Sequence, residues 1–376
     1  MFLNLRLFVQ PMVSYDQQIK EMEDQLRKAQ YNKHTEHHFG VVKAQIAKLR
    51  ERAQKRQGIG TSSAGFAVKK SGDATAIILG FPSVGKSTLL NALTGAQSKV
   101  AAYSFTTLNV IPGVLQYKHA SIQILDVPGI IQGAASGRGR GREVLSIMRN
   151  SDVIMMVIEA LHPENYQALL GEVYEAGVRL NQKPPDVRIA KRSKGGVILN
   201  STVKMTKVSP ETCIAIMREM RINNADVVIR QDITMDEFID AIEGNRVYIP
   251  SVLVVSKADL LDASAKAELQ KTLKPDVFVS CETKQGIAEL KESLHKSMGF
   301  MRVFLKEINK KPDLDVPMIL RSPVTLRSVC EHIHRDFVRK FRYARLWGKS
   351  AKFPGQQFRQ LDKAIHDGDI VELHIS

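Results

Sequence analysis

The segment GFPSVGKS, Gly80 to Ser87, constrains the fold of this 376-residue chain more than any other feature. It fits the pattern G-x-x-x-x-G-K-[ST]. It lies between the apolar run Ala74–Leu79, which predicts a buried strand, and the helical segment Lys86–Thr94. Glycine lets backbone N–H groups approach phosphate oxygens, and the helix N-terminus adds a positive dipole end. The sequence therefore predicts a phosphate-binding loop at a strand-to-helix junction.

Within this loop, Lys86 can reach the β- and γ-phosphates of a nucleotide, and Ser87 can give an oxygen ligand to Mg²⁺. The residues that we expect to bind the nucleotide here are Phe81, Pro82, Ser83, Val84, Gly85, Lys86, Ser87 and Thr88.

Apolar runs continue to alternate with helical segments along the chain, which predicts an α/β fold with a mostly parallel sheet covered on both faces. The predicted strands are Val114–Tyr117, Ser121–Leu125, Val153–Ile158, Val252–Val255 and Val277–Ser280. Residues 74–177 and 247–301 form this core, and residues 178–246 are expected to be a small inserted α/β domain. A helical hairpin is expected within residues 1–73. A connector and a β-rich module with one helix, Leu326–Phe337, are expected within 302–376.

The net charge of +15 is concentrated at the two ends of the chain. Residues 1–73 carry 13 Lys/Arg against 7 Asp/Glu, and residues 302–376 carry 15 against 9. Two basic flanks around a balanced core favour a nucleic-acid partner, and a merely solvated surface is the alternative.

Three scattered cysteines fit neither a disulfide framework nor a zinc cluster, which favours a cytosolic protein. No apolar run reaches the roughly 18 residues of a membrane span. The apolar start is expected to be an over-extended one, with Met12 as the natural first residue, and a flexible or packed N-terminal strand is the alternative.

Two further motifs complete a phosphate site. Asp126-Val-Pro-Gly129 follows the strand Ser121–Leu125, so that Asp126 can hold Mg²⁺ through water and the Gly129 N–H can bond the γ-phosphate. Between the two loops, Thr106 and Thr107 both have the spacing to place a hydroxyl on Mg²⁺ while the γ-phosphate is present. This pattern predicts a switch that orders with the triphosphate.

Two loops after later strands favour guanine. In Ser256-Lys257-Ala-Asp259, the Asp259 carboxylate can accept from the guanine N1–H and 2-amino group, and the Lys257 stem can cover the base. In the loop that begins at Ser280 and Cys281, a backbone N–H can contact guanine O6.

These segments resemble the developmentally regulated GTP-binding (DRG) family of the Obg-like GTPases. The resemblance is carried by GFPSVGKSTLLNALTG, YSFTTLNVIPG, DVPGIIQGAASGRGRGREVLS, RLNQKPPDV, NADVVIR and EGNRVYIP, and it covers almost all of the chain from Met12 onward. It implies an N-terminal helical region, a Ras-like GTPase (G) domain, an insertion similar to domain 2 of ribosomal protein S5, and a C-terminal β-grasp (TGS) domain. It also implies ribosome association, sometimes with a small regulatory protein, and it favours Thr107 over Thr106.

Three positions depart from common GTPase patterns. Ser256 replaces an asparagine that ties the guanine loop to the phosphate loop, so we expect guanine specificity with weaker affinity. Ile130 and Ile131 stand where many GTPases have a water-orienting glutamine, which predicts slow intrinsic hydrolysis. Ser83 stands where relatives often carry a potassium-binding asparagine, so K⁺ dependence stays open.

Two basic segments allow several interpretations. Arg138, Arg140 and Arg142 could contact the nucleotide phosphates, contact RNA, or be solvated. In FRYARLW, Phe341 to Trp347, the alternation favours aromatic side chains that face inward and basic ones that face outward.

Together these observations predict an Mg²⁺-dependent GTPase, with Lys86, Thr107 and Gly129 as catalytic residues, that acts as a switch on ribosomes or RNA in translation. A nucleotide-gated scaffold with incidental hydrolysis and an Obg-like ATPase are the alternatives.

Overall fold

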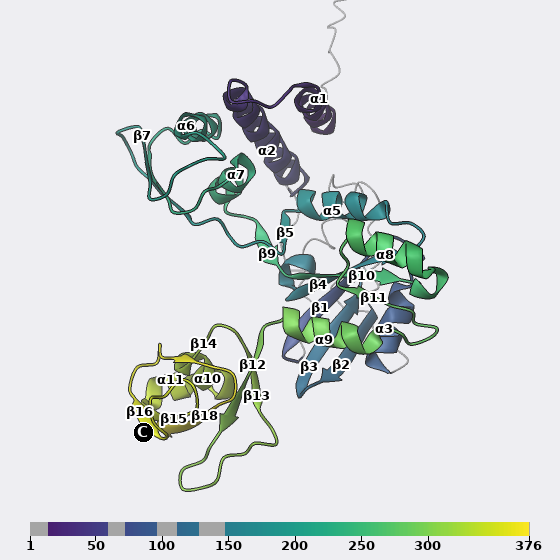
Figure 1. Cartoon of the computed structure of the whole chain (residues 1–376). Coiled ribbons are helices and arrows are strands. Elements are labelled where there is room, and N and C mark those ends of the chain that lie inside the picture. Colours follow the sequence, from purple (N-terminus) through teal and green to yellow (C-terminus); the bar gives the residue numbers. More distant parts are fainter. Residues whose placement is uncertain (1–13, 59–71, 96–110, 128–146, 376) are drawn as a thin grey trace, which may run out of the picture. The chain divides into compact units, whose positions relative to one another are not determined.

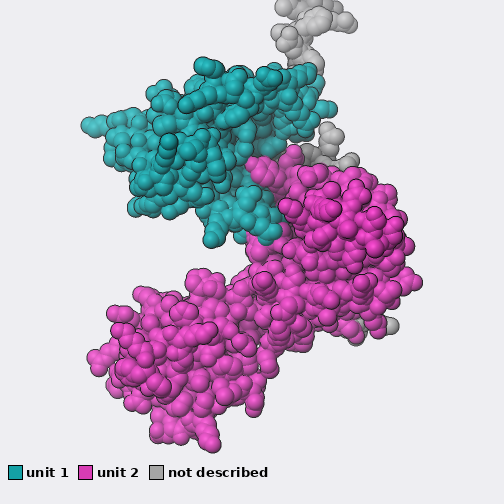
Figure 2. All heavy atoms as spheres, in the orientation of Figure 1, with its two compact units in different colours: residues 1–64, 135–139, 177–248 teal, residues 65–134, 140–176, 249–376 magenta. Residues whose placement is uncertain are grey.

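The structure is a computed structural model that describes residues 14–58, 72–95, 111–127 and 147–375 (Figure 1). The described chain divides into two compact units (Figure 2). One contains the N-terminal helices and residues 177–248, and the other contains the remainder. No helix within these ranges has the length and apolarity needed to cross a membrane.

A six-stranded sheet is the centre of the second unit, with strand order β11-β10-β4-β1-β3-β2. All neighbouring pairs are parallel except β2 with β3. The strands are β1 (Ala74–Leu79), β2 (Ile111–Tyr117), β3 (Ala120–Asp126), β4 (Val153–Glu159), β10 (Ser251–Ser256) and β11 (Val277–Phe278). Both faces of β1 and nearly all of β4 are buried, as expected of a parallel sheet between helices.

Within the described ranges, the helices that accompany this sheet include α3 (Lys86–Thr94), α5 (Asn165–Glu175), α8 (Ala263–Thr272) and α9 (Ile287–Ser297). Leucines of α3 and α9 share one core cluster with β1, β3 and β4. The sequence therefore predicted the α/β class and the parallel sheet correctly.

The first unit combines the helical hairpin with the inserted segment. Its elements are α1 (Tyr15–Lys28), α2 (Glu36–Gly58), β5 (Val178–Leu180), β6 (Val187–Lys191), β7 (Val197–Ser201), α6 (Pro210–Glu219), β8 (Ala225–Ile229), α7 (Met235–Glu243) and β9 (Val247–Ile249). The sheet order is β6-β8-β7, and one core joins α2, α6, α7 and these strands. A Cβ on Gly40 would lie 2.6 Å from Thr212 Cγ2, so glycine permits the close approach of α2 to α6.

The C-terminal module is a five-stranded sheet with order β13-β12-β18-β15-β16, accompanied by two helices and the short pair β14–β17. Its elements are β12 (Phe300–Leu305), β13 (Met318–Arg321), β14 (Val324–Thr325), α10 (Leu326–Ile333), α11 (Arg335–Lys340), β15 (Phe341–Trp347), β16 (Gln356–Phe358), β17 (Ala364–Ile365) and β18 (Asp369–Ile375).

Two predictions for this module were wrong. The single helix Leu326–Phe337 is two helices, because His334 is extended (φ −166°, ψ 140°) and its side chain caps α11. In β15, Phe341 packs against the core and Arg342 and Arg345 are exposed, as predicted. However, Ala344 and Leu346 are the buried residues, whereas Tyr343 and Trp347 lie outside the core cluster. A register shift between Phe341 and Tyr343 inverts the alternation that the sequence suggested.

Candidate nucleotide-binding site

The candidate site lies where parallel strands end. In the sheet register, Asp126 at the end of β3 pairs with Ile78 of β1, and Glu159 at the end of β4 pairs with Ser256 of β10. The carboxyl ends of parallel strands meet at one edge, where open α/β sheets bind their ligands. The predicted phosphate loop, Asp126 and the guanine loop are therefore brought to the same edge.

The phosphate loop contains residues with positive φ angles and a glycine that lies close to the neighbouring strand. Ser83 (φ 65°) and Gly85 (φ 89°) both have left-handed backbone conformations, which glycine adopts without strain. A Cβ on Gly80 would lie 2.6 Å from the Val157 carbonyl oxygen, so a larger residue would disturb the neighbouring strand β4. The loop then enters α3, whose first free N–H groups and positive dipole end suit an anion.

Lys86 is buried at the start of α3. Its Nζ donates to the carbonyl oxygens of Phe81 at 2.9 Å and Gly80 at 3.2 Å, so the ammonium group lies under the loop. Burial lowers the pKa of Lys86, and the nearby Asp126 carboxylate opposes that shift. An ammonium held by two carbonyls in a desolvated place interacts strongly with an added phosphate.

Ser87 and Asp126 form the second feature of the site. The Ser87 hydroxyl donates to Asp126 Oδ2 at 2.5 Å. Burial raises the pKa of Asp126, while Ser87 and Lys86 act in the opposite direction. A hydroxyl beside a buried carboxylate supplies the hard oxygen ligands that Mg²⁺ prefers, so these residues fit the metal that the sequence predicts.

The guanine loop is tied to its surroundings by Ser256. Its hydroxyl lies 2.8 Å from the Val84 carbonyl oxygen and 3.2 Å from that of Ile158. The shorter serine therefore reaches the phosphate loop, although the sequence suggested that its reach would be limiting. The Ala258 N–H also donates to the Val279 carbonyl at 3.1 Å.

Sequence reasoning missed Glu159 as a residue of this site. Lys257 has a left-handed backbone (φ 54°), and its Nζ lies 2.8 Å from Glu159 Oε1. The only sequence signal for Glu159 is a charge at the end of an otherwise apolar strand, VIMMVIE.

The loop after β11 holds the last predicted contacts. Ser280 is fully buried, its N–H donates to the Gln285 carbonyl at 3.0 Å, and its hydroxyl accepts from the Thr283 N–H at 3.2 Å. Cys281 is half-buried, and burial followed by the charge of Asp259 raises its pKa. The Ala258 N–H bond to the Val279 carbonyl joins the two guanine loops.

Some residues that the sequence predicts for this site lie outside the described ranges. They are Thr106, Thr107, Gly129, Ile130, Ile131, Arg138, Arg140 and Arg142.

Three features lie at one edge of the sheet: a phosphate loop, a pair of oxygen ligands suited to Mg²⁺, and a loop suited to guanine. Together they define a P-loop GTPase. Residues 75–191 match the family described as "50S ribosome-binding GTPase", residues 194–300 match the C-terminal region of that domain, and residues 301–375 match the TGS domain.

Sequence relatives assign the chain to a particular family within this class of GTPases. The chain is 50% identical to an uncharacterised GTP-binding protein of Methanocaldococcus jannaschii, over 96% of this chain and 93% of the relative. It is 42% identical to developmentally-regulated G-protein 3 of Arabidopsis thaliana, over 95% and 98%. It is 40% identical to a developmentally-regulated GTP-binding protein 1 homologue of Dictyostelium discoideum, over 96% and 99%. The chain therefore belongs to the developmentally regulated GTP-binding protein family.

Solved structures resemble the chain more distantly. The G domain of FeoB from Methanococcus jannaschii is 18% identical with a TM-score of 0.33, and it covers 61% of this chain and 99% of its own. The family assignment rests on the sequence relatives.

Proposed function

We propose that this GTPase is a cytoplasmic, Mg²⁺-dependent switch that acts on ribosomes or their RNA in translation. The description "50S ribosome-binding GTPase" for residues 75–191, together with the basic ends of the chain, supports this role. The observation that carries the hydrolytic part is the grouping of Lys86, Ser87 and Asp126, with the Ser87 hydroxyl 2.5 Å from the Asp126 carboxylate.

In this proposal, the phosphate loop from Phe81 to Thr88 wraps the phosphates with its N–H groups. The Lys86 ammonium exchanges its carbonyl partners for phosphate oxygens and neutralises charge as the γ-phosphoryl group leaves. Ser87 directly and Asp126 through water would hold Mg²⁺, which when bound neutralises phosphate charge. Thr107 and Gly129 are proposed, from the sequence pattern, to respond to the γ-phosphate.

The base contacts are proposed from the two guanine loops, which begin at Ser256 and at Ser280. Asp259 accepts from the guanine N1–H and 2-amino group, and the Lys257 stem covers the base. Because the Ser280 N–H already donates to Gln285, the Cys281 N–H is the better candidate for guanine O6. These contacts favour GTP over ATP. A comparison of the GTP turnover rate in KCl and in NaCl tests whether Ser83 supports a bound K⁺.

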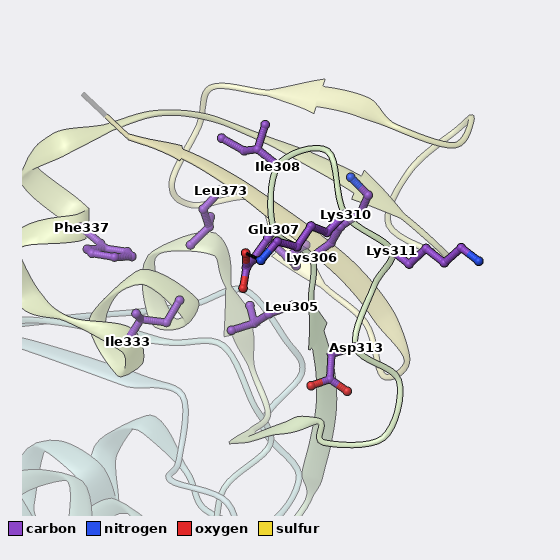
Figure 3. Close-up of a pocket in the computed structure, with 11 residues that line it drawn as sticks. Leu305, Lys306, Glu307, Ile308, Lys310, Lys311, Asp313, Ile333, Phe337 and Leu373 are labelled. Carbon is purple, nitrogen blue, oxygen red and sulfur yellow. Dashed lines mark ion pairs between the residues drawn. The ribbon is translucent and has the colours of Figure 1, made fainter.

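The TGS module has a groove that suits a regulatory protein (Figure 3). The groove has a volume of about 740 Å³ and lies beside the loop that follows β12. Leu305, Ile333, Phe337 and Leu373 supply its apolar side (Figure 3). The other side carries charges of both signs, from Lys306, Glu307, Lys310, Lys311 and Asp313, with Lys306 paired to Glu372 and Lys310 to Glu307. An amphipathic segment with one apolar and one charged face would match both sides.

The proposed function is tested by GTP turnover with and without purified ribosomes, at low and high salt, with Lys86→Ala as the inactive control. Stimulation that fades with salt is expected for an enzyme docked on RNA. Negligible turnover under every condition, with partner affinity that differs between GTP and GDP, would favour the gated scaffold. ATP binding equal to GTP binding would favour the ATPase alternative.

A further inference from the structure

The inserted domain carries an exposed basic surface that the GTPase site does not use. From Val187 to Pro210 the chain has six Lys/Arg and no Asp/Glu. This stretch forms β6, a turn and β7, the two outer strands of the sheet β6-β8-β7. An acid-free basic stretch of this length on paired strands concentrates positive potential on one small domain.

One face of this sheet is open. The alternating residues Val187, Ile189, Val197 and Leu199 pack toward the core shared with α6 and α7. The residues between them, among them Arg188, Ile198 and Asn200, are exposed on the opposite face. The Cα pairing places Arg188 and Asn200 opposite the same residue of β8, Val228, so the two lie across one row of the face.

The turn Arg192–Gly196 between the strands is held in one conformation. The Asn224 side chain accepts from the Gly196 N–H at 2.8 Å, and the Arg192 N–H donates to the Asn224 carbonyl at 3.0 Å. Gly195 (φ 105°) and Gly196 (φ 74°) supply the left-handed backbone that the turn needs. The basic side chains therefore project from a fixed backbone, which reduces the entropy lost on binding.

The charge on this surface is mostly uncompensated. Arg192 pairs with Asp226 of β8. Arg188, Lys191 and Lys194 are exposed and belong to none of the ion pairs formed within the described ranges. Long cationic side chains on a shallow face suit the phosphates of a nucleic-acid backbone, which need no deep pocket.

We infer that an RNA-backbone docking surface is formed by the turn end of the sheet β6-β8-β7, where the exposed Lys191 and Lys194 lie, together with Arg188 on the open face. The inference rests on the proposed ribosome or RNA role and assigns part of it to the inserted domain. Binding there is electrostatic and independent of base sequence, because the cationic side chains meet phosphates rather than bases.

The test compares two full-length variants that each lose three positive charges. The first is Arg188→Ala/Lys191→Ala/Lys194→Ala. The matched control is Lys271→Ala/Lys274→Ala/Lys296→Ala, which removes exposed lysines of the GTPase domain. Binding is measured by anisotropy with a fluorescein-labelled RNA hairpin, and by cosedimentation with ribosomes, from 50 to 200 mM KCl. Basal GTP turnover and thermal unfolding check that both variants fold.

For the first variant, we expect about tenfold weaker hairpin binding at the lower salt. The dependence of log K on log salt should also become smaller, by about 0.7–0.9 for each phosphate that the variant no longer neutralises. The control should bind like the wild type. Equal binding by all three proteins, or equally weakened binding by both variants, would overturn this inference and leave the ribosome role standing. A wild-type protein that binds neither RNA nor ribosomes would overturn both. A first variant that binds RNA normally but no longer binds an acidic protein would assign the surface to a different partner and overturn the RNA inference.

Discussion

The Ser256 hydroxyl lies 2.8 Å from the Val84 carbonyl oxygen, so the loop that is expected to read the base is fastened to the loop that is expected to hold the phosphates. Ser256 is 5% exposed and Val84 is 3% exposed, so this bond is shielded from water. A buried hydrogen bond between two loops fixes their spacing, because breaking it leaves the carbonyl without that donor. The spacing between base and phosphate contacts should therefore depend on one hydroxyl group.

Replacing Ser256 by alanine tests this dependence. The Val84 and Ile158 carbonyl oxygens would lose a buried donor, which costs about 1–3 kcal/mol. If this cost falls on the bound state, GTP and GDP should both bind roughly 5- to 150-fold more weakly, measured by titration with fluorescent analogues. Ser256→Thr keeps the hydroxyl and should recover most of the affinity. Unchanged affinity in the alanine variant would show that the tie does not position the loops.

The ion pair between Glu159 and Lys257 leads to a prediction about the selectivity for GTP over ATP. The Glu159 carboxylate, 2.8 Å from the Lys257 ammonium, holds that side chain at the edge of the guanine loop. Glu159→Gln weakens this restraint, so the ratio of GTP to ATP affinity should fall severalfold, with ATP affinity little changed. Competition binding measures the ratio. Glu164→Gln is the control, because Glu164 is exposed and its ion-pair partner among the described residues is the neighbouring His162. A similar fall there would contradict the specific role.

Asp126 should lower the stability of the nucleotide-free protein. Burial raises the pKa of its carboxyl, so the folded chain favours the protonated form more than the unfolded chain does. At pH 7 the ionised group therefore lowers the free energy of unfolding, and this effect shrinks as the pH falls from the raised pKa to the ordinary value of an aspartate carboxyl. Asp126→Asn retains an oxygen for Ser87 and removes the charge.

The melting temperature of Asp126→Asn without nucleotide should accordingly exceed that of the wild type at pH 7, and the difference should shrink in acid. Mg²⁺-dependent GTP turnover should be lost at the same time. Scanning fluorimetry with EDTA and a phosphate-release assay provide the two readings. A less stable variant at pH 7 would refute the assignment of a buried, unfavourable charge.

The limits of sequence reasoning follow from particular elements. The strand Ala74–Leu79 and the helix Lys86–Thr94 were predicted with the bounds that the structure shows, because a fully apolar run and a glycine-containing loop are local signals. Tyr343 and Trp347 were placed on the wrong face, since one register shift next to Phe341 inverts a period-two pattern. Glu159 was missed because its partner, Lys257, is 98 residues away and is brought close only by strand pairing.

The inserted domain contains a buried ion cluster that should control its stability. Asp240 of α7 accepts from Arg179 Nε at 2.6 Å, from Arg179 Nη2 at 2.8 Å and from Arg246 Nε at 2.9 Å. The Arg179 and Asp240 side chains are only 3% and 6% exposed. Removing one member of a buried ion pair is far more harmful than removing a surface pair, because the remaining charge stays desolvated.

Asp240→Ala should therefore destabilise the domain by about 3–5 kcal/mol. On the same helix, Asp236 pairs with Lys43 at 2.6 Å but is 45% exposed, so Asp236→Ala should change stability by about 0–1 kcal/mol. Urea unfolding followed by circular dichroism gives both values on otherwise identical chains. Comparable losses of stability in the two variants would mean that solvent reaches the Arg179–Asp240 pair. The larger effect at Asp240 is expected because Arg179 and Arg246 both donate to this carboxylate and the Arg179 side chain is only 3% exposed.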